Sequence, residues 1–418
     1  MNHLIAYLSN RRDALIWAGI GILAIVLRIA LANKIPPDRE WLDAAIYDRL
    51  AQSLLAGEGY ALDGNPTRMC PPSYPFFVAS IYAFTGRNLT AIVLVQSLVG
   101  VGRAYLVGWL ATRIFDRRAG IVAALLVALY PALIYYDTRI LREGFTAFLN
   151  VATLCAAWRA RSEQKEDYLL VGGLLAAVSL TRPETIILIG PAALLALGPN
   201  IDYQKLLRPA VFVLIPILVG WVPWTVRNQQ TFGSWSPVRA GIVSTIWFGS
   251  RWAESGGDDQ TAEDRAALKK VFKSKVQGAG DAEFEDRFKG DISADLLGRP
   301  LWLARMVGKK AVMFWKDANG VKRTLPEIHS ALPVLLNTCY YSLLILALVA
   351  AYVGRRQWPV RTLFITVVIY AATYALLHVR NRYRVPLLPI VFILSSGGLI
   401  WLWDEIRSRL AQSPSTPD

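Results

Sequence analysis

Two acidic residues stand beside apolar segments, where a carboxylate could do chemistry. Asp43 opens a helical stretch in the first polar loop, and Glu143 stands at the start of a later apolar run. Ionisable groups near membrane depth are costly and are often functional. A carboxylate at a helix N-terminus can also serve only the helix dipole, so both interpretations stand. As functional groups, Asp43 could act as a base, and Asp43 with Glu143 could orient an acceptor or hold a divalent cation.

A third candidate, Arg182, follows an apolar run and precedes Pro183. Proline disfavours the helical conformation of the residue before it, so we expect the helix to break here. Broken helices at membrane depth are tolerated where they line a cavity or are covered by protein. We therefore expect Arg182 to bind phosphate; the alternative is a local ion pair with Glu184.

Two clusters of cationic residues follow later in the chain. Three arginines within five residues indicate an anion-binding site, because guanidinium groups bind phosphate oxygens in pairs. Arg28 and Arg103 lie within the first two apolar segments, where they either join this site or pair internally. The clusters contain Arg227 and Asn228 in the first, and Arg380, Arg382 and Arg384 in the second.

The composition is that of a polytopic membrane protein. Hydrophobic residues make up 54% of the 418 residues and charged residues only 18%, against about 25% charged in ordinary globular domains. The net charge of +14 comes from Lys and Arg in short runs between apolar segments, which favours membrane topology over nucleic-acid binding. Three scattered cysteines predict neither a disulfide framework nor a metal site.

About ten segments are apolar enough to be membrane spans, counting short ones that neighbouring helices would cover. The expected spans are Leu15–Leu31, Leu89–Phe115, Ile121–Tyr136, Ile140–Ala157, Tyr168–Leu180, Thr185–Leu197, Pro209–Val226, Ala331–Val353, Thr362–Val379 and Pro386–Trp403. The positive-inside rule then places both termini in the cytoplasm. All the candidate residues fall on the outer side, and a bacterial inner membrane is the expected location.

This count divides the chain into four expected parts. Residues 1–226 hold seven spans and the first outer loop, residues 32–88, with amphipathic helices at the membrane surface. Residues 227–330 form an outer helical region, in which Trp302 to Trp315 is amphipathic and is expected in the interface, with Lys310 among its charged residues. Residues 331–403 hold the last three spans, and residues 404–418 form a cytoplasmic tail.

Motifs for nucleotide use are missing from the sequence. There is no phosphate-binding P-loop, no dinucleotide fingerprint and no GxSxG elbow. His3, His329 and His378 are far apart and predict no zinc site. The sequence therefore gives no support for energy coupling or nucleotide use. No cofactor is certain, and a divalent cation stays open.

Several short motifs occur in an order that resembles the GT-C membrane glycosyltransferases of the glycosyltransferase family 39 group. The resemblance runs from about residue 15 to residue 403. Its motifs are Asp43-x-x-x-Tyr47, Gly57-x-Gly59-Tyr60, Pro71-Pro72-x-Tyr74-Pro75, Thr181-Arg182-Pro183, Pro223-Trp224-x-x-Arg227-Asn228 and Arg382-Tyr383-Arg384-x-Pro386.

The resemblance implies an inverting transfer of one sugar from a polyprenyl-phosphate-sugar to an envelope glycolipid or glycan outside the membrane. It implies Asp43 as the catalytic acid–base residue and Glu143 as the second acidic position. Members often carry a Lys before the double proline, where this chain has Cys70, so Arg68 would substitute. The donor phosphate would meet Arg182, Arg380, Arg382, Arg384 and Arg68, and the sugar pocket would contain Tyr47, Tyr74, Tyr383, Arg227 and Asn228.

Two other functions fit the same residues. A protein O-mannosyltransferase would use the same donor chemistry on a Ser or Thr hydroxyl. A transporter or flippase of a lipid-linked saccharide would bind the phosphate without catalysis, although no inverted repeat of the kind transporters show is apparent in the sequence.

Overall fold

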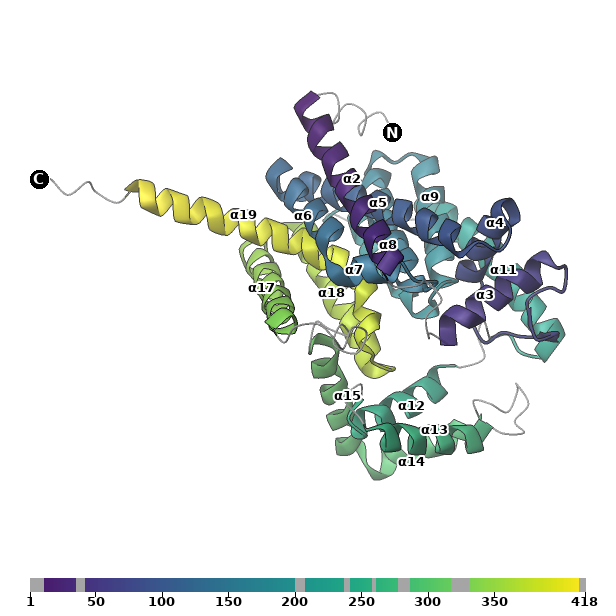
Figure 1. Cartoon of the computed structure of the whole chain (residues 1–418). Helices are drawn as coiled ribbons and strands as arrows, with labels where there is room; N and C mark the ends of the chain where they lie inside the picture. The colour runs from purple at the N-terminus through teal and green to yellow at the C-terminus, as the bar shows by residue number, and fades with distance from the viewer. Residues whose placement is uncertain are drawn as a thin grey trace, which may run out of the picture.

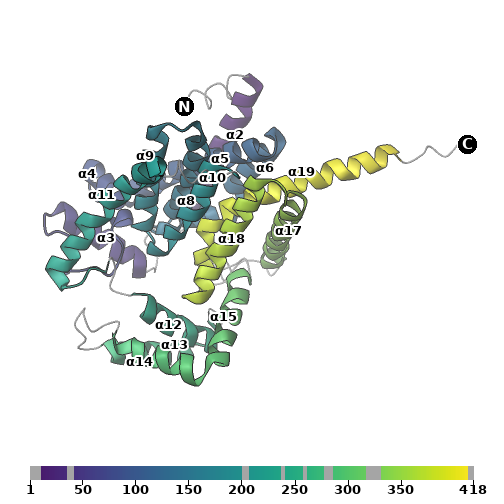
Figure 2. The same cartoon turned by 180° about the vertical axis from the view of Figure 1, so that it is seen from behind.

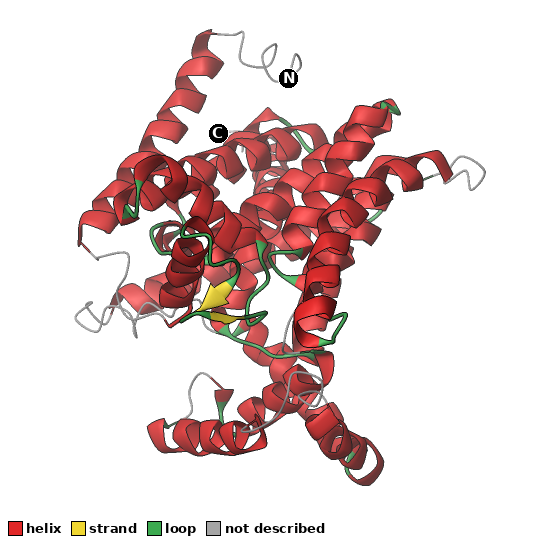
Figure 3. Cartoon of the chain, turned by 90° about the vertical axis from the view of Figure 1, so that its right-hand side faces the viewer, coloured by secondary structure: helices red, strands yellow, loops and turns green. Residues whose placement is uncertain are grey.

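The computed structural model describes residues 11–34, 42–199, 207–236, 241–257, 261–276, 286–316 and 331–412. Helices dominate this part of the chain. Within it, the only sheet is a short hairpin in which β1 (Ala61–Leu62) pairs antiparallel with β2 (Asn65–Pro66) (Figure 3). The all-α fold expected from the sequence is confirmed.

The first half of the chain forms a bundle in which α5 packs on α6 and α8, and α9 packs on α8 and α11. Two polar caps begin helices: Asn88 accepts from the backbone of Ala91 at the start of α5, and Asp116 accepts from Ala119 at the start of α6. The helices are α2 (Arg11–Lys34), α3 (Leu42–Leu55), α4 (Ser73–Thr85), α5 (Leu89–Ile114), α6 (Arg117–Leu129), α7 (Pro131–Asp137), α8 (Arg142–Arg159), η1 (Ala160–Ser162), α9 (Lys165–Ser179), η2 (Pro183–Leu188), α10 (Ile189–Leu197) and α11 (Leu207–Phe232).

The second half adds an outlying group of helices and three long ones. Helices α12 to α15 lie together at one end of the bundle, with α15 next to the end of α18, and the last turns of α19 extend beyond the other helices (Figures 1 and 2). The bounds are α12 (Ile242–Glu254), α13 (Ala262–Val276), α14 (Asp286–Gly298), α15 (Pro300–Trp315), α17 (Ala331–Val353), α18 (Trp358–Leu376), η5 (Asn381–Leu387) and α19 (Leu388–Gln412).

Helix length and composition do not confirm ten spans. Six helices in the described ranges are long and apolar enough to cross a membrane, or seven if α6 and α7, bent by 56° at Tyr130, form one broken span. The expected fourth, fifth and sixth spans are helical but do not meet these requirements of length and composition. α9 has 15 residues, or about 22 Å of helix, against about 30 Å of hydrocarbon. The six are Ala14–Lys34, Leu89–Ile114, Leu207–Phe232, Val334–Val353, Trp358–Leu376 and Asn381–Ala411.

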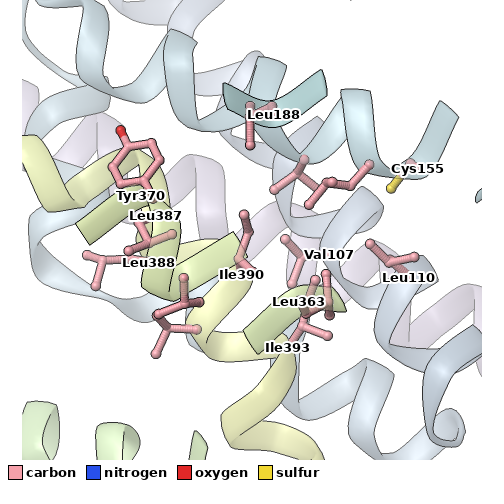
Figure 4. Packing of buried hydrophobic residues seen from close by; sticks show 14 of the residues in the cluster. Val107, Leu110, Cys155, Leu188, Leu363, Tyr370, Leu387, Leu388, Ile390 and Ile393 are labelled. Atoms are coloured by element: carbon pink, nitrogen blue, oxygen red, sulfur yellow. The ribbon is translucent and has the colours of Figure 1, made fainter. Parts of the chain in front are cut away.

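Buried apolar side chains from both halves form one main core. Figure 4 shows Val107 and Leu110 of α5 near Leu363 of α18 and Ile390 and Ile393 of α19. All five are completely buried. This packing fixes the last three helices against the first bundle, so that loops from both halves of the chain meet at one end.

Candidate active site

Four segments that are far apart in the sequence meet at one end of the bundle. They are the first turn of α3, the first turn of α8, the break between α9 and η2, and the 3-10 helix η5. They supply Asp43, Glu143, Arg182 and Arg382, in that order. The structure therefore brings together the candidate acids and two of the candidate arginines.

Asp43 and Arg382 form an ion pair near the surface of this site. The Nη2 of Arg382 donates to the Oδ2 of Asp43. The Asp43 side chain keeps 35% of its exposure and that of Arg382 keeps 11%. Asp43 is therefore the carboxylate that a molecule arriving from solvent can reach.

Glu143 lies deeper, with only 1% of its side chain exposed. Its Oε1 accepts a hydrogen bond from Nη2 of Arg182 at 2.9 Å and lies 3.6 Å from Nε of Arg382. Its place in the first turn of α8 adds the favourable end of the helix dipole. Glu143 therefore lies between Arg182 and Arg382 at the buried side of the site.

Arg182 is held on several sides. It adopts an extended backbone before Pro183, as expected for a residue preceding proline. Its Nη1 donates to the hydroxyl of Tyr374 at 3.0 Å and lies 3.3 Å from the Oε1 of Glu184, to which the Tyr374 hydroxyl also donates at 2.7 Å. Its Cζ lies 4.8 Å from the ring centroid of Tyr383. The proposed pairing with Glu184 is present, together with a stronger contact to Glu143.

Burial and charge act in opposite directions on Asp43. Burial favours a higher pKa for its carboxyl, but Arg382, then Arg142 and Arg380, outweigh that effect and lower the pKa below its usual value. Burial raises the pKa of the nearby Cys70 thiol to about 11. At neutral pH Asp43 is thus ionised and Cys70 keeps its proton.

Arg142 and Arg380 are the other two cations beside this site. The Nη1 of Arg142 donates to the backbone oxygen of Thr181 at 2.9 Å, which joins the start of α8 to the helix break. The Nε of Arg380 donates to Nε2 of His378 at 3.3 Å, and its Cζ lies 4.7 Å from the ring of Trp252 on α12. Arg142 was not among the phosphate-binding candidates predicted from the sequence.

Arg384, two residues after Arg382, turns toward α15. Its Nη1 donates at 2.9 Å to the backbone oxygens of Phe314 and Lys316, at the C-terminal end of that helix, and its Cζ lies 5.0 Å from the ring of Tyr340. These carbonyls have no intrahelical donor, so Arg384 caps α15. The grouping of the three arginines in the sequence suggested that Arg384 lies beside Asp43. In the structure it contacts α15 instead.

Arg68, Arg227 and Asn228 form a separate group beside α11. Arg227 donates to the backbone oxygens of Tyr60 (3.0 Å) and Thr67 (2.8 Å). The Nη1 of Arg68 donates to Ser234 at 2.8 Å, and the Nδ2 of Asn228 donates to the backbone of Ser236 at 3.0 Å. These contacts fasten the β1–β2 hairpin to the end of α11, which continues past the expected end of the seventh span at residue 226.

Tyr47 of α3 and Tyr74 of α4 pack these two helices against each other. Their rings meet edge to face at 4.9 Å, and both are buried. The hydroxyl of Tyr74 donates to Oε1 of Gln96 at 2.6 Å, while Nε2 of Gln96 donates to the backbone oxygens of Asp137 and Arg139. The two tyrosines therefore join the first loop to the turn before Glu143.

Comparisons with known proteins agree on the fold. Residues 70–226, less than half of the chain, match the family described as dolichyl-phosphate-mannose-protein mannosyltransferase. The oligosaccharyltransferase AglB of Archaeoglobus fulgidus, solved with an inhibitory peptide and a dolichol-phosphate, superimposes on 99% of this chain with 16% identity and a TM-score of 0.55. The protein has the GT-C fold.

Two further solved structures also match. The same archaeal enzyme solved with Zn and sulfate covers 95% of this chain at 17% identity and a TM-score of 0.56. ArnT of Cupriavidus metallidurans, bound to undecaprenyl phosphate, covers 97% of this chain and 81% of its own at 13% identity and a TM-score of 0.42. This chain spans about half of AglB, 53% and 50% in the two structures. No curated protein sequence matches it.

The resemblance to the GT-C family 39 group is confirmed, and the matched segment contains two of the four central residues. Residues 70–226 include Glu143 and Arg182 but neither Asp43 nor Arg382. Asp43 and Arg382 lie outside the matched segment, and the tertiary structure brings them next to Glu143 and Arg182.

A buried acid that sequence reasoning missed is Asp137, at the end of α7. It accepts hydrogen bonds from Nε of Arg28 (2.9 Å) and from both terminal nitrogens of Arg103 (3.1 and 2.7 Å). Gly144 leaves it room, since a Cβ there would lie 2.1 Å from its Oδ1. Arg28 and Arg103 therefore pair internally. Two arginines within spans require an acid, and that was the signal for Asp137.

The central residues fit a metal ion poorly. No group of three His, Cys, Asp or Glu side chains that could hold a metal occurs in the described part of this GT-C chain. Asp43 and Glu143 do converge, as the sequence suggested, but on the guanidinium of Arg382.

Proposed function

We propose that this protein transfers a single sugar, with inversion, from a polyprenyl-phosphate-linked donor to a hydroxyl of a cell-envelope glycolipid or glycan. The observation that carries the proposal is the meeting of Asp43 with Arg382 and of Glu143 with Arg182 in one connected group. A bacterial inner membrane, with both termini in the cytoplasm and this group on the outer side, is part of the proposal.

Transfer needs a base on the acceptor and a cation on the leaving group. The acceptor oxygen attacks the anomeric carbon, its proton passes to Asp43, and the bond from that carbon to the phosphate oxygen breaks. The electron pair of that bond leaves with the polyprenyl phosphate. Asp43 suits the role of base because it is ionised and reachable, whereas Glu143 is covered.

The arginines divide the remaining work. Arg380 and Arg382 are only partly buried, so they can meet a phosphate. Arg182 is 1% exposed and bound to Glu143, Glu184 and Tyr374, so it acts on the phosphate at short range or holds Glu143 in place. We assign Arg384, Arg68, Arg227 and Asn228 to holding the surrounding helices and the hairpin.

A protein Ser or Thr hydroxyl is the second candidate acceptor. The family matched by residues 70–226 is described as a protein mannosyltransferase, which favours it. Mass spectrometry of envelope glycolipids, glycans and glycoproteins in a deletion strain distinguishes the two, because the molecule that lacks one sugar is the acceptor.

The decisive experiment compares Asp43→Asn with Asp63→Asn. Both aspartates lie in the first loop, but Asp63 is 72% exposed and pairs with Arg49. Purified protein is mixed with a radiolabelled polyprenyl-phosphate-sugar and with membranes from the deletion strain. Asp43→Asn is expected to lose transfer by at least about 100-fold and to keep donor binding. Undiminished transfer by Asp43→Asn would refute the assignment of the base, and translocation of the donor without transfer would favour a flippase.

A further inference from the structure

The two candidate carboxylates share one guanidinium. Arg382 contacts Asp43 through Nη2 and lies 3.6 Å from Glu143 through Nε. Carboxylate oxygens that converge from two helices are the usual ligands of Mg²⁺ or Mn²⁺. We propose that Arg382 occupies the position of a divalent cation between Asp43 and Glu143, so that the fixed positive charge of this site is a guanidinium and the site works without a metal.

The first support is the charge already present around the two acids. Arg142, Arg182, Arg380 and Arg382 all act on Asp43 or Glu143 through contact or charge. Glu184, bound to Arg182, is a third carboxylate of the cluster. The four guanidiniums therefore exceed the three carboxylates by one positive charge. A divalent cation would raise that excess to three charges in a largely buried place, where charge repulsion is poorly screened.

The second support is that several nearby atoms able to bind a metal are already engaged or protonated. The Oε1 of Glu184 accepts from Tyr374 and faces Arg182. The Nε2 of His378 accepts from Arg380. Cys70 keeps its proton because burial raises its pKa to about 11, and a metal would need the thiolate. Hydrogen bonds at Glu184 and His378, and the bound proton at Cys70, therefore oppose metal binding by these three atoms.

The third support is that a guanidinium can do what the cation would do here. Arg382 presents five N–H donors in one plane and stays charged at every physiological pH. Two sides of it meet Asp43 and Glu143, and its side chain keeps 11% of its exposure. In the proposed transfer its positive charge stabilises the negative charge that develops on the leaving phosphate. The inference rests on the proposed function only for this role in transfer.

The test is a titration of the purified full-length protein with Mn²⁺, followed by electron paramagnetic resonance of free Mn²⁺. The wild type is expected to show no stoichiometric site at Asp43. Arg382→Ala removes the guanidinium that the two carboxylates share and is expected to bind one Mn²⁺ at least about tenfold more tightly than the wild type, and Asp43→Asn in that background removes the site. Arg87→Ala is the matched control, because it breaks an ion pair with Asp48, which is not one of the two converging carboxylates.

A stoichiometric Mn²⁺ site in the wild type that Asp43→Asn abolishes would overturn the inference. So would an Arg382→Ala protein, monodisperse on size exclusion, that binds no more Mn²⁺ than the wild type. Arg382→Gln guards against misfolding of the alanine variant and is expected to gain the same site. Transfer by the wild type in excess chelator should stay within about twofold of the untreated rate. Loss of transfer there contradicts the inference, whereas a wild type that transfers no sugar at all contradicts the proposed function only.

Discussion

The ion pairs of Asp137 allow a prediction about stability that is independent of function. Asp137 carries one negative charge between two guanidiniums, and the side chains of Arg28, Arg103 and Asp137 are 0%, 0% and 1% exposed. Arg28 lies on α2, Arg103 on α5 and Asp137 at the end of α7. Asp137→Asn keeps the shape of the side chain and leaves two buried guanidiniums without a countercharge.

Removing one partner of a buried ion pair costs about 3–5 kcal/mol. Thermal unfolding has an entropy of about 2.1 cal/mol/K per residue, or roughly 0.9 kcal/mol/K for a chain of this length, so Tm should fall by about 3–6 °C. Arg28→Met should cost less, because Arg103 keeps Asp137 neutralised and the local excess charge disappears. We therefore expect the highest Tm for the wild type, a lower Tm for Arg28→Met and the lowest Tm for Asp137→Asn.

The assay is thermal unfolding of the detergent-purified protein, followed by size-exclusion chromatography with fluorescence detection. The control is Asp404→Asn, which breaks an equally short pair with Arg118 (2.7 and 2.6 Å) in which both side chains are about half exposed. Exposed pairs contribute about 0–1 kcal/mol, so its shift should be about 1 °C or less. If Asp137→Asn unfolds no lower than Arg28→Met or Asp404→Asn, the account of an uncompensated buried charge is wrong.

Three other predictions follow from the geometry. Arg382→Gln removes the cation that lowers the pKa of Asp43 most, while burial still raises that pKa. The acid limb of the rate–pH profile should therefore move to higher pH. An unmoved limb contradicts Asp43 as the base. Burial lowers the pKa of Lys310 to about 8 from 10.5, so the unfolded state binds more protons between those values and stability should rise with pH there, a rise in Tm that Lys310→Met should reduce. Gly249→Ala would place a Cβ 2.1 Å from a backbone oxygen of the turn after α18 and should lower both Tm and transfer, whereas Gly290→Ala, with open space around it in α14, should leave transfer unchanged and should not lower Tm.

Local rules predicted much of the fold. All ten apolar segments contain helix, because hydrophobic runs of this length have to satisfy their backbone groups internally. The break at Arg182 follows from Pro183, and the convergence of Asp43, Glu143 and Arg182 follows from placing their loops on one side. The count of ten spans is not confirmed, because an apolar run does not reveal whether a short helix crosses the membrane or stops within the protein.

Partner choice was beyond local rules. Arg382 and Arg384 look equivalent in the sequence, yet one meets Asp43 and the other caps α15. Lys310 was expected with the charged residues of its helix, but it is 1% exposed and donates to the backbone oxygens of Leu376 and Leu377 at the end of α18. Such contacts depend on which helix end lies opposite, and that information is in the tertiary structure alone.

The short turn η5 has a practical consequence for inhibition. Because Arg382 and Arg384 are two residues apart on this turn, only two peptide bonds separate the residue that caps α15 from the residue that pairs with Asp43. We therefore expect an antibody fragment that displaces the α12–α15 group to slow the proposed sugar transfer without contacting Asp43. Screening for such allosteric binders needs only the outlying helices as the epitope.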